Sequence, residues 1–345
     1  MFWIMGADEF VESLGKANHV GIVGFLRYEL EHSEWEGFRF YDLIFPLFLF
    51  MVGISTVLSV GKLLEREGKW TAHKRILRRF ALLWIWAFIL DGGFAQAQVS
   101  FAGVLQRISY CYLITSLLYC HLRLRGLVTV CLVILAGYWA LLSFVPVPDI
   151  GQPTFEMHKN WSNYLDKHYL PGNREARGWR NEGMLSTLPA ICTCLLGVFA
   201  GLFLNDDSRT PKKKAYWLMV IGCMLAGLGF LWGMQLPVIK RIWTSSYVLV
   251  SGGYSCVLLG LFYLVVDVWG YRRWATPFVW IGSNALAMYL IGNLIQYKYL
   301  TGRVVGGGIQ TWLSPYDAVA QIALWMCMLT LLARFLYKRN ILLRV

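Results

Sequence analysis

The strongest constraint in this sequence is a series of apolar segments, each about 20 residues long, that recurs along the whole chain. Twenty residues of α-helix span about 30 Å, the thickness of the hydrocarbon core of a bilayer. Only 15% of the residues are charged, compared with about 25% in soluble domains. We therefore predict an all-α, polytopic transmembrane helix bundle, with residues 1–345 forming a single integral membrane domain. Nine complete spans are expected, near residues 42–63, 76–94, 101–120, 126–145, 184–204, 215–234, 245–268, 277–297 and 316–337.

The N-terminal residues are also apolar. Met1–Gly6 lack the basic segment that begins a signal peptide. Residues 1–41 are nevertheless expected to reach the outer face of the membrane by about residue 10. We interpret the first residues as the second half of a first span, so that an intact chain has ten spans with both termini inside.

Basic residues are distributed unequally between the two sets of connections. One set, with the C-terminal tail, carries 18 basic residues: Lys62, Arg66, Lys69, Lys74, Arg75, Arg78, Arg79, Arg123, Arg125, Arg209, Lys212, Lys213, Lys214, Arg272, Arg273, Lys338, Arg339 and Arg344. The short connections of the other set carry only Lys240, Arg241, Lys298 and Arg303. By the positive-inside rule the first set is cytoplasmic. Residues 1–41 and the long loop 146–183 are then extracytoplasmic.

The net charge of +12 is therefore a topology signal, and nucleic-acid binding is not expected. All eight cysteines lie in apolar runs, which favours packing roles over disulfides or zinc ligands. The six histidines lack the spacing of metal ligands, so no metal site is predicted.

Polar side chains recur in the outer half of the predicted bundle. Such groups cost a few kcal/mol each inside a span, so each needs a partner or a task. They are Asp8, Asp42, Asp91, Gln106, Arg107, Glu182, Asn284, Asn293 and Gln296. Individually, they could be interfacial residues or inter-helix hydrogen bonds, and Asn284 could simply join helices. Together they predict a polar pocket that binds a substrate.

A histidine among acidic residues lies at the mouth of this pocket. Residues 31–42 read Glu-His-Ser-Glu-Trp-Glu-Gly-Phe-Arg-Phe-Tyr-Asp and meet the apolar run directly. A histidine there can exchange protons near neutral pH. Glu31, Glu34 or Asp42 could orient the imidazole of His32, and Trp35 is a candidate for stacking on a sugar face.

The loop 146–183 could cover the pocket, because long ordered loops are often functional. Within it, residues 160–167 predict a short amphipathic helix that ends at Leu170-Pro171-Gly172.

Four motifs in order resemble the heparan-α-glucosaminide N-acetyltransferase family. They are His32–Gly37 followed by Asp42–Gly53, Gly103–Ile108, Glu182–Thr187 and Gly282–Leu286. The resemblance implies a transmembrane acyltransferase that moves acetyl from cytoplasmic acetyl-CoA to an amino sugar or glycan outside. The family's catalytic histidine corresponds to His32. Two departures stand out: Arg180-Asn181-Glu182-Gly183 replaces an Asp-Pro-Glu-Gly turn, and Gly6-Ala7-Asp8 lies where the lysosomal enzyme has an asparagine.

Several alternatives remain open at this point. His32 could act as a general base or carry the acetyl group covalently. Arg107 could bind a phosphate or carboxylate, polarise the carbonyl, or pair with Asp91 or Asp42 as a structural element. Clusters such as Lys212–Lys214 could attract the phosphates of CoA, although topology alone explains them.

Two other functions compete with the acyltransferase. A sugar transporter or permease would use the same cavity, but such proteins usually carry an internal repeat, and none is evident. A catalytically silent subunit that binds a saccharide is the third reading. A bacterial inner membrane is expected, with the site facing the periplasm, and a homodimer is compatible with this interpretation.

Overall fold

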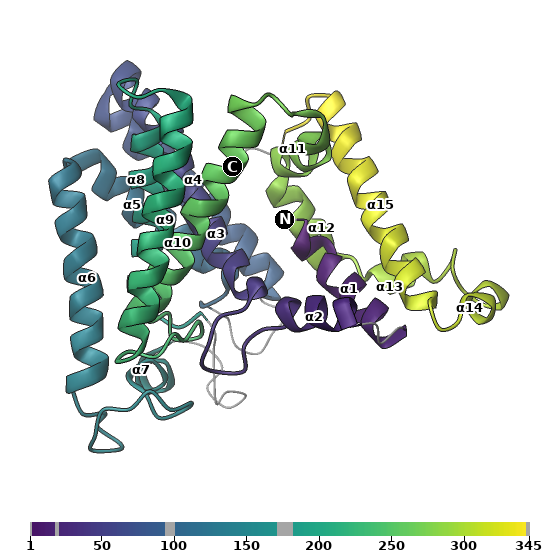
Figure 1. Ribbon diagram of the computed structural model, residues 1–345, viewed down its shortest axis with the longest axis horizontal. Coiled ribbons are helices and arrows are strands. Elements are labelled where there is room, and N and C mark those ends of the chain that lie inside the picture. The colour runs from purple at the N-terminus through teal and green to yellow at the C-terminus, as the bar shows by residue number, and fades with distance from the viewer. Residues whose placement is uncertain (1, 18–20, 94–100, 171–181, 343–345) are drawn as a thin grey trace. The chain divides into compact units, whose positions relative to one another are not determined.

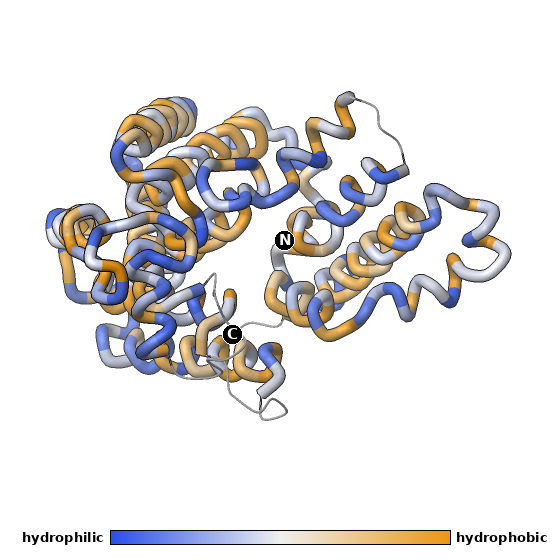
Figure 2. The backbone as a smooth tube through the Cα atoms, turned by 90° about the horizontal axis from the view of Figure 1, so that it is seen from below, coloured by the Kyte–Doolittle hydropathy of each residue, from blue (hydrophilic) through white to orange (hydrophobic). Residues whose placement is uncertain are grey.

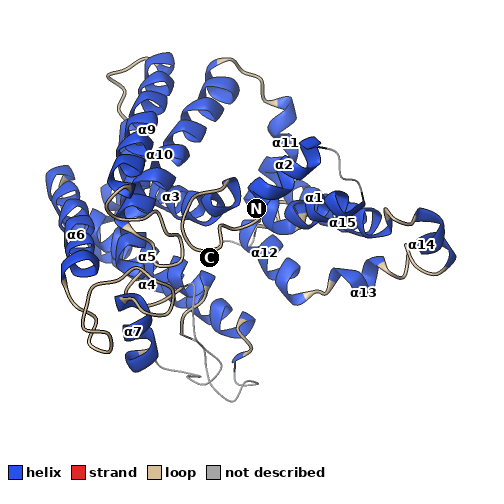
Figure 3. Cartoon of the chain, turned by 60° about the horizontal axis from the view of Figure 1, so that its bottom comes forward, coloured by secondary structure: helices blue, strands red, loops and turns tan. Residues whose placement is uncertain are grey.

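The computed structural model describes residues 2–17, 21–93, 101–170 and 182–342. Every regular element in these residues is a helix (Figure 3). The chain forms two compact units. Unit 1 comprises Met1–His32, Arg39–Tyr41 and Trp269–Val345, and unit 2 comprises Ser33–Phe38 and Asp42–Val268. The predicted all-helical fold class is confirmed for the described residues.

Unit 2 contains most of the long helices. They are α3 (Ile44–Thr56), the π-helix η3 (Val57–Gly61), α4 (Lys62–Leu90), α5 (Val104–His121), α6 (Leu124–Phe144), α7 (Trp161–Tyr169), α8 (Thr187–Leu204), α9 (Pro211–Gly233), α10 (Ser245–Phe262) and the π-helix η5 (Tyr263–Val268). The short 3-10 turn η2 (Phe40–Leu43) immediately precedes α3.

Glycines allow the central helices of unit 2 to approach closely. A Cβ added at Gly197 of α8 would lie 1.9 Å from the carbonyl oxygen of Phe50 on α3, and one at Gly53 would lie 2.0 Å from that of Cys194. The α9–α10 pair uses Gly222 and Gly253 in the same way. Small residues at such crossings let dispersion contacts hold helices together where lipid offers no hydrophobic driving force.

Apart from α15, unit 1 is built from shorter helices. They are η1 (Trp3–Met5), α1 (Ala7–Ala17), α2 (Gly21–Leu30), η6 (Arg273–Ala275), α11 (Thr276–Ser283), α12 (Ala285–Leu294), α13 (Tyr297–Thr301), α14 (Gly308–Leu313) and α15 (Asp317–Lys338). Helix α1 packs against α2 and α15. The unit has its own core, in which Met5, Met288, Trp325 and Leu329 are buried together.

In the part of the chain that the structure describes, six helical stretches are long and apolar enough to cross a membrane. They are Phe40–Leu90, Leu124–Phe144, Thr187–Leu204, Pro211–Gly233, Ser245–Val268 and Asp317–Lys338. Apolar residues follow the helices and hydrophilic ones gather at many connections (Figure 2). The chain is an integral membrane protein, but the expected nine spans are not confirmed.

The differences from the predicted spans have local causes. The expected span 42–63 and residues 76–90 of the expected span 76–94 belong to one helical stretch of 51 residues, whose backbone is non-helical at Gly68 (φ 82°). Residue 94 lies outside the described residues. The predicted span 277–297 is wrong as a single helix, because the backbone of Asn284 (φ −125°, ψ 38°) separates α11 from α12. Helix α5 forms where residues 101–120 were expected to span, but it is not among the six apolar stretches.

The N-terminal residues differ from the expected end of a first span. They form η1, α1 and α2, and α1 and α2 have only 11 and 10 residues. The predicted helix near 160–167 is confirmed as α7, where the side chain of Asn160 accepts a hydrogen bond from the Asn163 amide at 3.1 Å.

The long loop that contains α7 and the basic connection between α8 and α9 lie at opposite ends of unit 2 (Figure 1). Helix α7 and its neighbouring loop lie at the bottom of Figure 1, whereas the basic connection between α8 and α9 lies at the top. Which of these ends faces the cytoplasm stays a prediction.

Candidate functional site

Asp42 is the most completely buried carboxylate among the predicted site residues, with 0% exposure. Its side chain accepts a hydrogen bond from the Ser33 amide at 3.2 Å and pairs with Lys240 Nζ at 3.3 Å. Its own carbonyl oxygen accepts from the Tyr247 hydroxyl at 2.7 Å. A buried carboxylate needs such partners, because the desolvation of a charge costs several kcal/mol. The bond to Asp42 thereby restrains the backbone of Ser33, the residue that follows His32 in the chain.

Lys240 is the partner that sequence reasoning missed. It lies between α9 and α10, and its side chain is only 18% exposed. Burial lowers its pKa, while Asp42 and Glu182 oppose this effect. In the sequence it was only one of two adjacent basic residues in a short loop, and no signal there pointed to Asp42.

Arg107 projects from α5 into the interior of unit 2 and is 1% exposed. Its Nη2 donates to Ser186 Oγ at 2.5 Å and to the Gly183 carbonyl at 3.2 Å. The guanidinium lies 5.0 Å from the ring centroid of Trp243. Its Nε and Nη1 atoms have no hydrogen-bond partner among the described residues. Arg107 therefore retains donors inside the protein.

The structural alternative for Arg107 named Asp91 and Asp42 as partners. Asp91 instead accepts a hydrogen bond from Gln106 at 2.8 Å, and Asp42 pairs with Lys240. The neighbours Gln106 and Arg107 thus have separate partners.

The segment before α8 is held by Asp166, which sequence reasoning also missed. Its carboxylate accepts from the Met184 amide at 2.9 Å. A Cβ at Gly183 would lie 1.9 Å from the same carboxylate, so this position requires glycine. Glu182 precedes that glycine and is partly buried.

Within unit 2, the segment that follows His32 is packed through Trp35. Its indole donates to the Phe155 carbonyl at 3.0 Å, and its ring packs beside Tyr138 and Ile242. The neighbouring Glu34 is exposed. Trp35 therefore has a packing role, and binding of a sugar by Trp35 or Glu34 stays a prediction.

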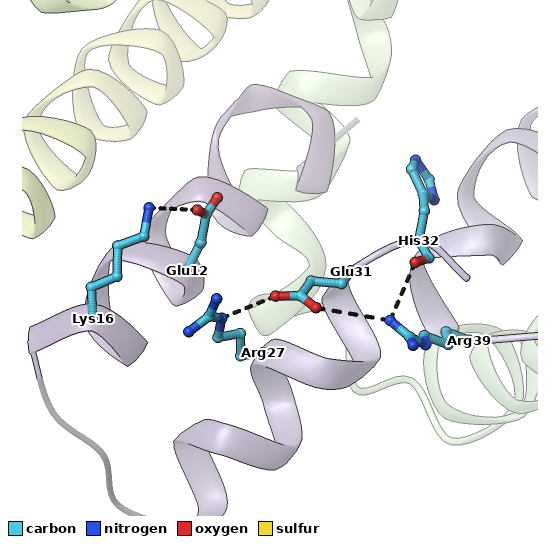
Figure 4. A network of polar contacts seen from close by, with 6 residues as sticks. All are labelled: Glu12, Lys16, Arg27, Glu31, His32 and Arg39. Atoms are coloured by element: carbon cyan, nitrogen blue, oxygen red, sulfur yellow. Dashed lines mark hydrogen bonds and ion pairs between the residues drawn. The ribbon is translucent and has the colours of Figure 1, made fainter. Parts of the chain in front are cut away.

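His32 is exposed and belongs to unit 1. Its carbonyl oxygen accepts from Arg39 Nη1 at 3.2 Å, and its imidazole points away from this contact (Figure 4). Glu31, expected as an orienting carboxylate, pairs with Arg27 at 3.0 Å and with Arg39 at 3.8 Å.

The imidazole of His32 contacts Tyr41, with ring centroids 4.6 Å apart. The hydroxyl of Tyr41 donates to Asp8 on α1. Sequence reasoning named Asp8 and His32 but not the tyrosine that connects them.

The two asparagines also belong to unit 1. Asn284 is buried and its amide donates to the Ile341 carbonyl at 3.1 Å, which agrees with a role in joining segments. Asn293 is exposed and donates to the Tyr289 carbonyl in its own helix. Neither contact points to a ligand, and their roles in substrate binding stay predictions.

The predicted site residues thus fall in both units. Unit 1 holds His32, Asp8, Asn284 and Asn293, whereas unit 2 holds Asp42, Glu34, Trp35, Asp91, Gln106, Arg107 and Glu182. Within the described residues, no group of three or more His, Cys, Asp or Glu side chains could hold a metal ion.

These features define a helical integral membrane protein with an exposed histidine and with charged groups buried inside its larger unit. The chain belongs to the heparan-alpha-glucosaminide N-acetyltransferase family, whose catalytic region matches residues 19–231. This confirms the family suggested by the four sequence motifs.

Two curated proteins are similar to most of this chain. The heparan-alpha-glucosaminide N-acetyltransferase of Homo sapiens is 28% identical, over 78% of this chain and 49% of that protein. The protein of the same name from Mus musculus is 27% identical, over 78% of this chain and 50% of its own length. The chain thus spans about half the length of the curated relatives it matches.

Proposed function

We propose that this chain is a membrane N-acetyltransferase that moves an acetyl group from acetyl-CoA to the amino group of an amino sugar or glycan. The observation that carries the proposal is the family match over residues 19–231. This range includes His32, Asp42, Arg107 and Glu182. The names of the two curated relatives support an amino sugar as the acceptor.

The proposed reaction joins the acceptor nitrogen to the acetyl carbonyl carbon and breaks the bond between that carbon and the sulfur of CoA. The amine must attack in its neutral form, so a base has to take its proton. His32 is proposed as this base, and the departing thiolate then takes a proton to give free CoA. An exposed imidazole suits this role, because it can return the proton to water after each cycle.

A second route gives His32 a covalent role. The imidazole would attack the thioester, hold the acetyl group on a ring nitrogen while CoA leaves, and then pass it to the amine. Both routes use the same residue, and they differ in whether acetyl-His32 accumulates when no acceptor is present.

The buried groups of unit 2 are proposed to bind substrate. The unpartnered Nε and Nη1 donors of Arg107 suit a carbonyl oxygen, a phosphate or a carboxylate. Glu182, Asp91, Gln106 and the Asp42–Lys240 pair would complete the polar surroundings. Asp8, Glu34, Trp35, Asn284 and Asn293 are kept as candidate acceptor-binding residues.

The location and assembly of the enzyme are part of the same proposal. Acetyl-CoA is taken from the cytoplasm, and the acceptor is met on the periplasmic side of a bacterial inner membrane. We propose a homodimer as the assembly. The mass of the protein in detergent, measured by light scattering, tests it, and a monomeric mass would contradict it.

The function is tested with purified full-length protein, labelled acetyl-CoA and glucosamine. We expect acetylated glucosamine from the wild type and at least a 100-fold lower rate from His32→Ala. His168→Ala serves as the matched control, since His168 is also exposed and lies on α7. Mass spectrometry of the protein before acceptor is added separates general-base transfer from acetyl-histidine.

The opposing outcomes are equally concrete. Full transfer by His32→Ala would remove His32 from the mechanism. Uptake of labelled sugar into proteoliposomes without acetyl-CoA, and without transfer, would support the transporter instead. The comparisons do not favour that alternative, because both curated relatives are named as N-acetyltransferases.

A further inference from the structure

We propose that Tyr41 is a positioning residue for the imidazole of His32, and that Asp8 holds Tyr41 in place for this task. The inference rests on the proposed function, because it concerns the same histidine. It adds a residue that neither the sequence motifs nor the comparisons assign. All three residues belong to unit 1.

The backbone around His32 is restrained by one set of contacts. Arg39 donates to the His32 carbonyl at 3.2 Å. The guanidinium of Arg39 lies 4.0 Å from the ring centroid of Tyr28 and pairs with Glu31. In Figure 4 the imidazole points away from this ion-pair chain. These contacts fix where the residue lies, but they leave the orientation of its ring to other groups.

The ring is contacted by Tyr41. The ring centroids of His32 and Tyr41 are 4.6 Å apart, with an angle of 50° between the planes. Tyr41 therefore limits the orientations open to the imidazole and is proposed to cover part of it.

Tyr41 is itself held from the opposite end. Its hydroxyl donates to the Asp8 carboxylate in the first turn of α1. Hydrogen bonds to a charged acceptor are stronger than those between neutral groups. The bond sets the orientation of the phenol ring, and with it the surface that His32 meets. Glu9 also acts on Tyr41 electrostatically, and the Glu31–Arg39 pair lies at the backbone of His32.

The contacts thus run from the Asp8 carboxylate on α1, through the Tyr41 phenol, to the imidazole of His32, the proposed base. No proton needs to pass along it, because the phenol keeps its hydrogen throughout. Its proposed effect is geometric, since a catalytic base must lie within hydrogen-bond reach of the proton that it removes.

The test compares Tyr41→Leu, Tyr41→Phe and Asp8→Ala in the full-length, detergent-solubilised protein. Tyr41→Leu removes the ring, whereas Tyr41→Phe keeps the ring face and loses only the bond to Asp8. Tyr299→Leu is the matched control, because Tyr299 is an exposed tyrosine of unit 1 whose ring faces Arg303. Thermal unfolding checks that each variant is folded.

The first readout does not need acetyl transfer. Diethylpyrocarbonate modifies accessible neutral imidazoles, and mass spectrometry of peptides reports the rate at His32 alone. We expect Tyr41→Leu to raise this rate at least threefold, because part of the ring is uncovered. Tyr41→Phe keeps the ring but loses the bond to Asp8, so it should raise the rate by less than Tyr41→Leu does, whereas Tyr299→Leu should leave the rate unchanged.

The second readout is the acetyl-transfer rate. We expect Tyr41→Leu to lower kcat about tenfold with little change in the KM for glucosamine. Tyr41→Phe and Asp8→Ala remove the same hydrogen bond, so both should lower kcat to a similar and smaller extent. Wild-type rates in both would overturn the role of Asp8. A pure loss of folding would instead lower the fraction of active protein and leave the KM and the His32 modification rate of the folded fraction unchanged.

The two proposals fail in distinguishable ways. An unchanged modification rate at His32 in Tyr41→Leu overturns the positioning role, whatever the enzyme assay shows. A raised modification rate with full transfer activity in His32→Ala would support the contact and overturn the proposed role of His32 in catalysis.

Discussion

The two units treat their charged side chains in opposite ways. In unit 1, the ion pairs beside His32 are exposed or partly exposed, with the side chains of Arg27, Glu31 and Arg39 40%, 47% and 19% accessible. In unit 2, Asp42 and Arg107 are almost completely buried. Exposed ion pairs contribute little to stability because water screens them, whereas removing one partner of a buried pair is costly. Unit 1 thus places His32 in contact with water, whereas unit 2 buries the charged groups that we propose to bind substrate, where electrostatic interactions are strong.

The largest expected effect is on the stability of unit 2. Asp42→Ala leaves Lys240 buried without its anion and removes the acceptor of the Ser33 amide. We expect it to lower the free energy of unfolding by about 3–5 kcal/mol, measured by chemical or thermal unfolding in detergent. Glu34→Ala, an exposed acid of the same unit, is the control and should change it little. The double variant Asp42→Asn/Lys240→Met should recover much of the loss. If Asp42→Ala and Glu34→Ala lowered the free energy of unfolding equally, burial would not explain the importance of Asp42.

A second prediction asks whether the burial in unit 2 depends on close helix packing. Gly197→Ala pushes a methyl group against α3 and should destabilise the protein by about 1–3 kcal/mol. Gly137→Ala on α6 meets open space and should stabilise it by up to about 1 kcal/mol, because alanine favours helix. Unfolding curves for the two variants should therefore shift in opposite directions. A gain in stability from Gly197→Ala would contradict the close approach.

The pH dependence of stability provides a third comparison. Burial lowers the pKa of Lys240 in the folded state, so the unfolded chain binds more protons between this lowered pKa and the ordinary value of about 10.4. Stability contributed by Lys240 should therefore rise with pH within that alkaline window and be constant below it. The difference in unfolding free energy between wild type and Lys240→Met isolates this effect. If the unfolding free energy of the wild type relative to Lys240→Met fell as the pH rose through this window, the predicted direction of the Lys240 effect would be wrong.

The smallest effect is expected for the ion pairs of unit 1. Glu31→Gln should change the unfolding free energy by no more than about 1 kcal/mol, because Glu31 and Arg27 are exposed and Arg39 is partly exposed. The change should shrink further at high salt. Glu12→Gln, which removes another exposed pair of the same unit, is the matched control. A loss as large as that of Asp42→Ala would remove the distinction between the units.

Much of the helical architecture could be predicted because it depends on local composition. The length of an apolar run indicates whether a helix can span the membrane. The side chain of Asn160 caps the start of α7, where a helix was expected. The prediction for 277–297 was wrong because the backbone at Asn284 leaves the helical region within an apolar run. The Asn284 side chain bonds to Ile341, 57 residues away, and the local pattern of apolar residues contains no trace of that contact.

The candidate site was predictable in its residue types but not in its pairings. His32, Asp42 and Arg107 stood out because polar groups are costly beside or inside a span. Their partners did not, because Lys240 resembled a loop charge and Tyr41 an ordinary interfacial aromatic. Asp8 and Tyr41 are separated by 33 residues, so only the folded chain brings them together.

The sequence by itself determined the helical class, the membrane setting and the family, because apolar run length and ordered motifs are properties of the chain read locally. Only the tertiary structure decided that Asp42 pairs with Lys240, that Arg107 keeps unpartnered donors, and that Tyr41 lies between Asp8 and His32. The physical reason is that a side-chain contact depends on which helices pack together, and packing is set by the summed burial and close approach of residues distant in the chain.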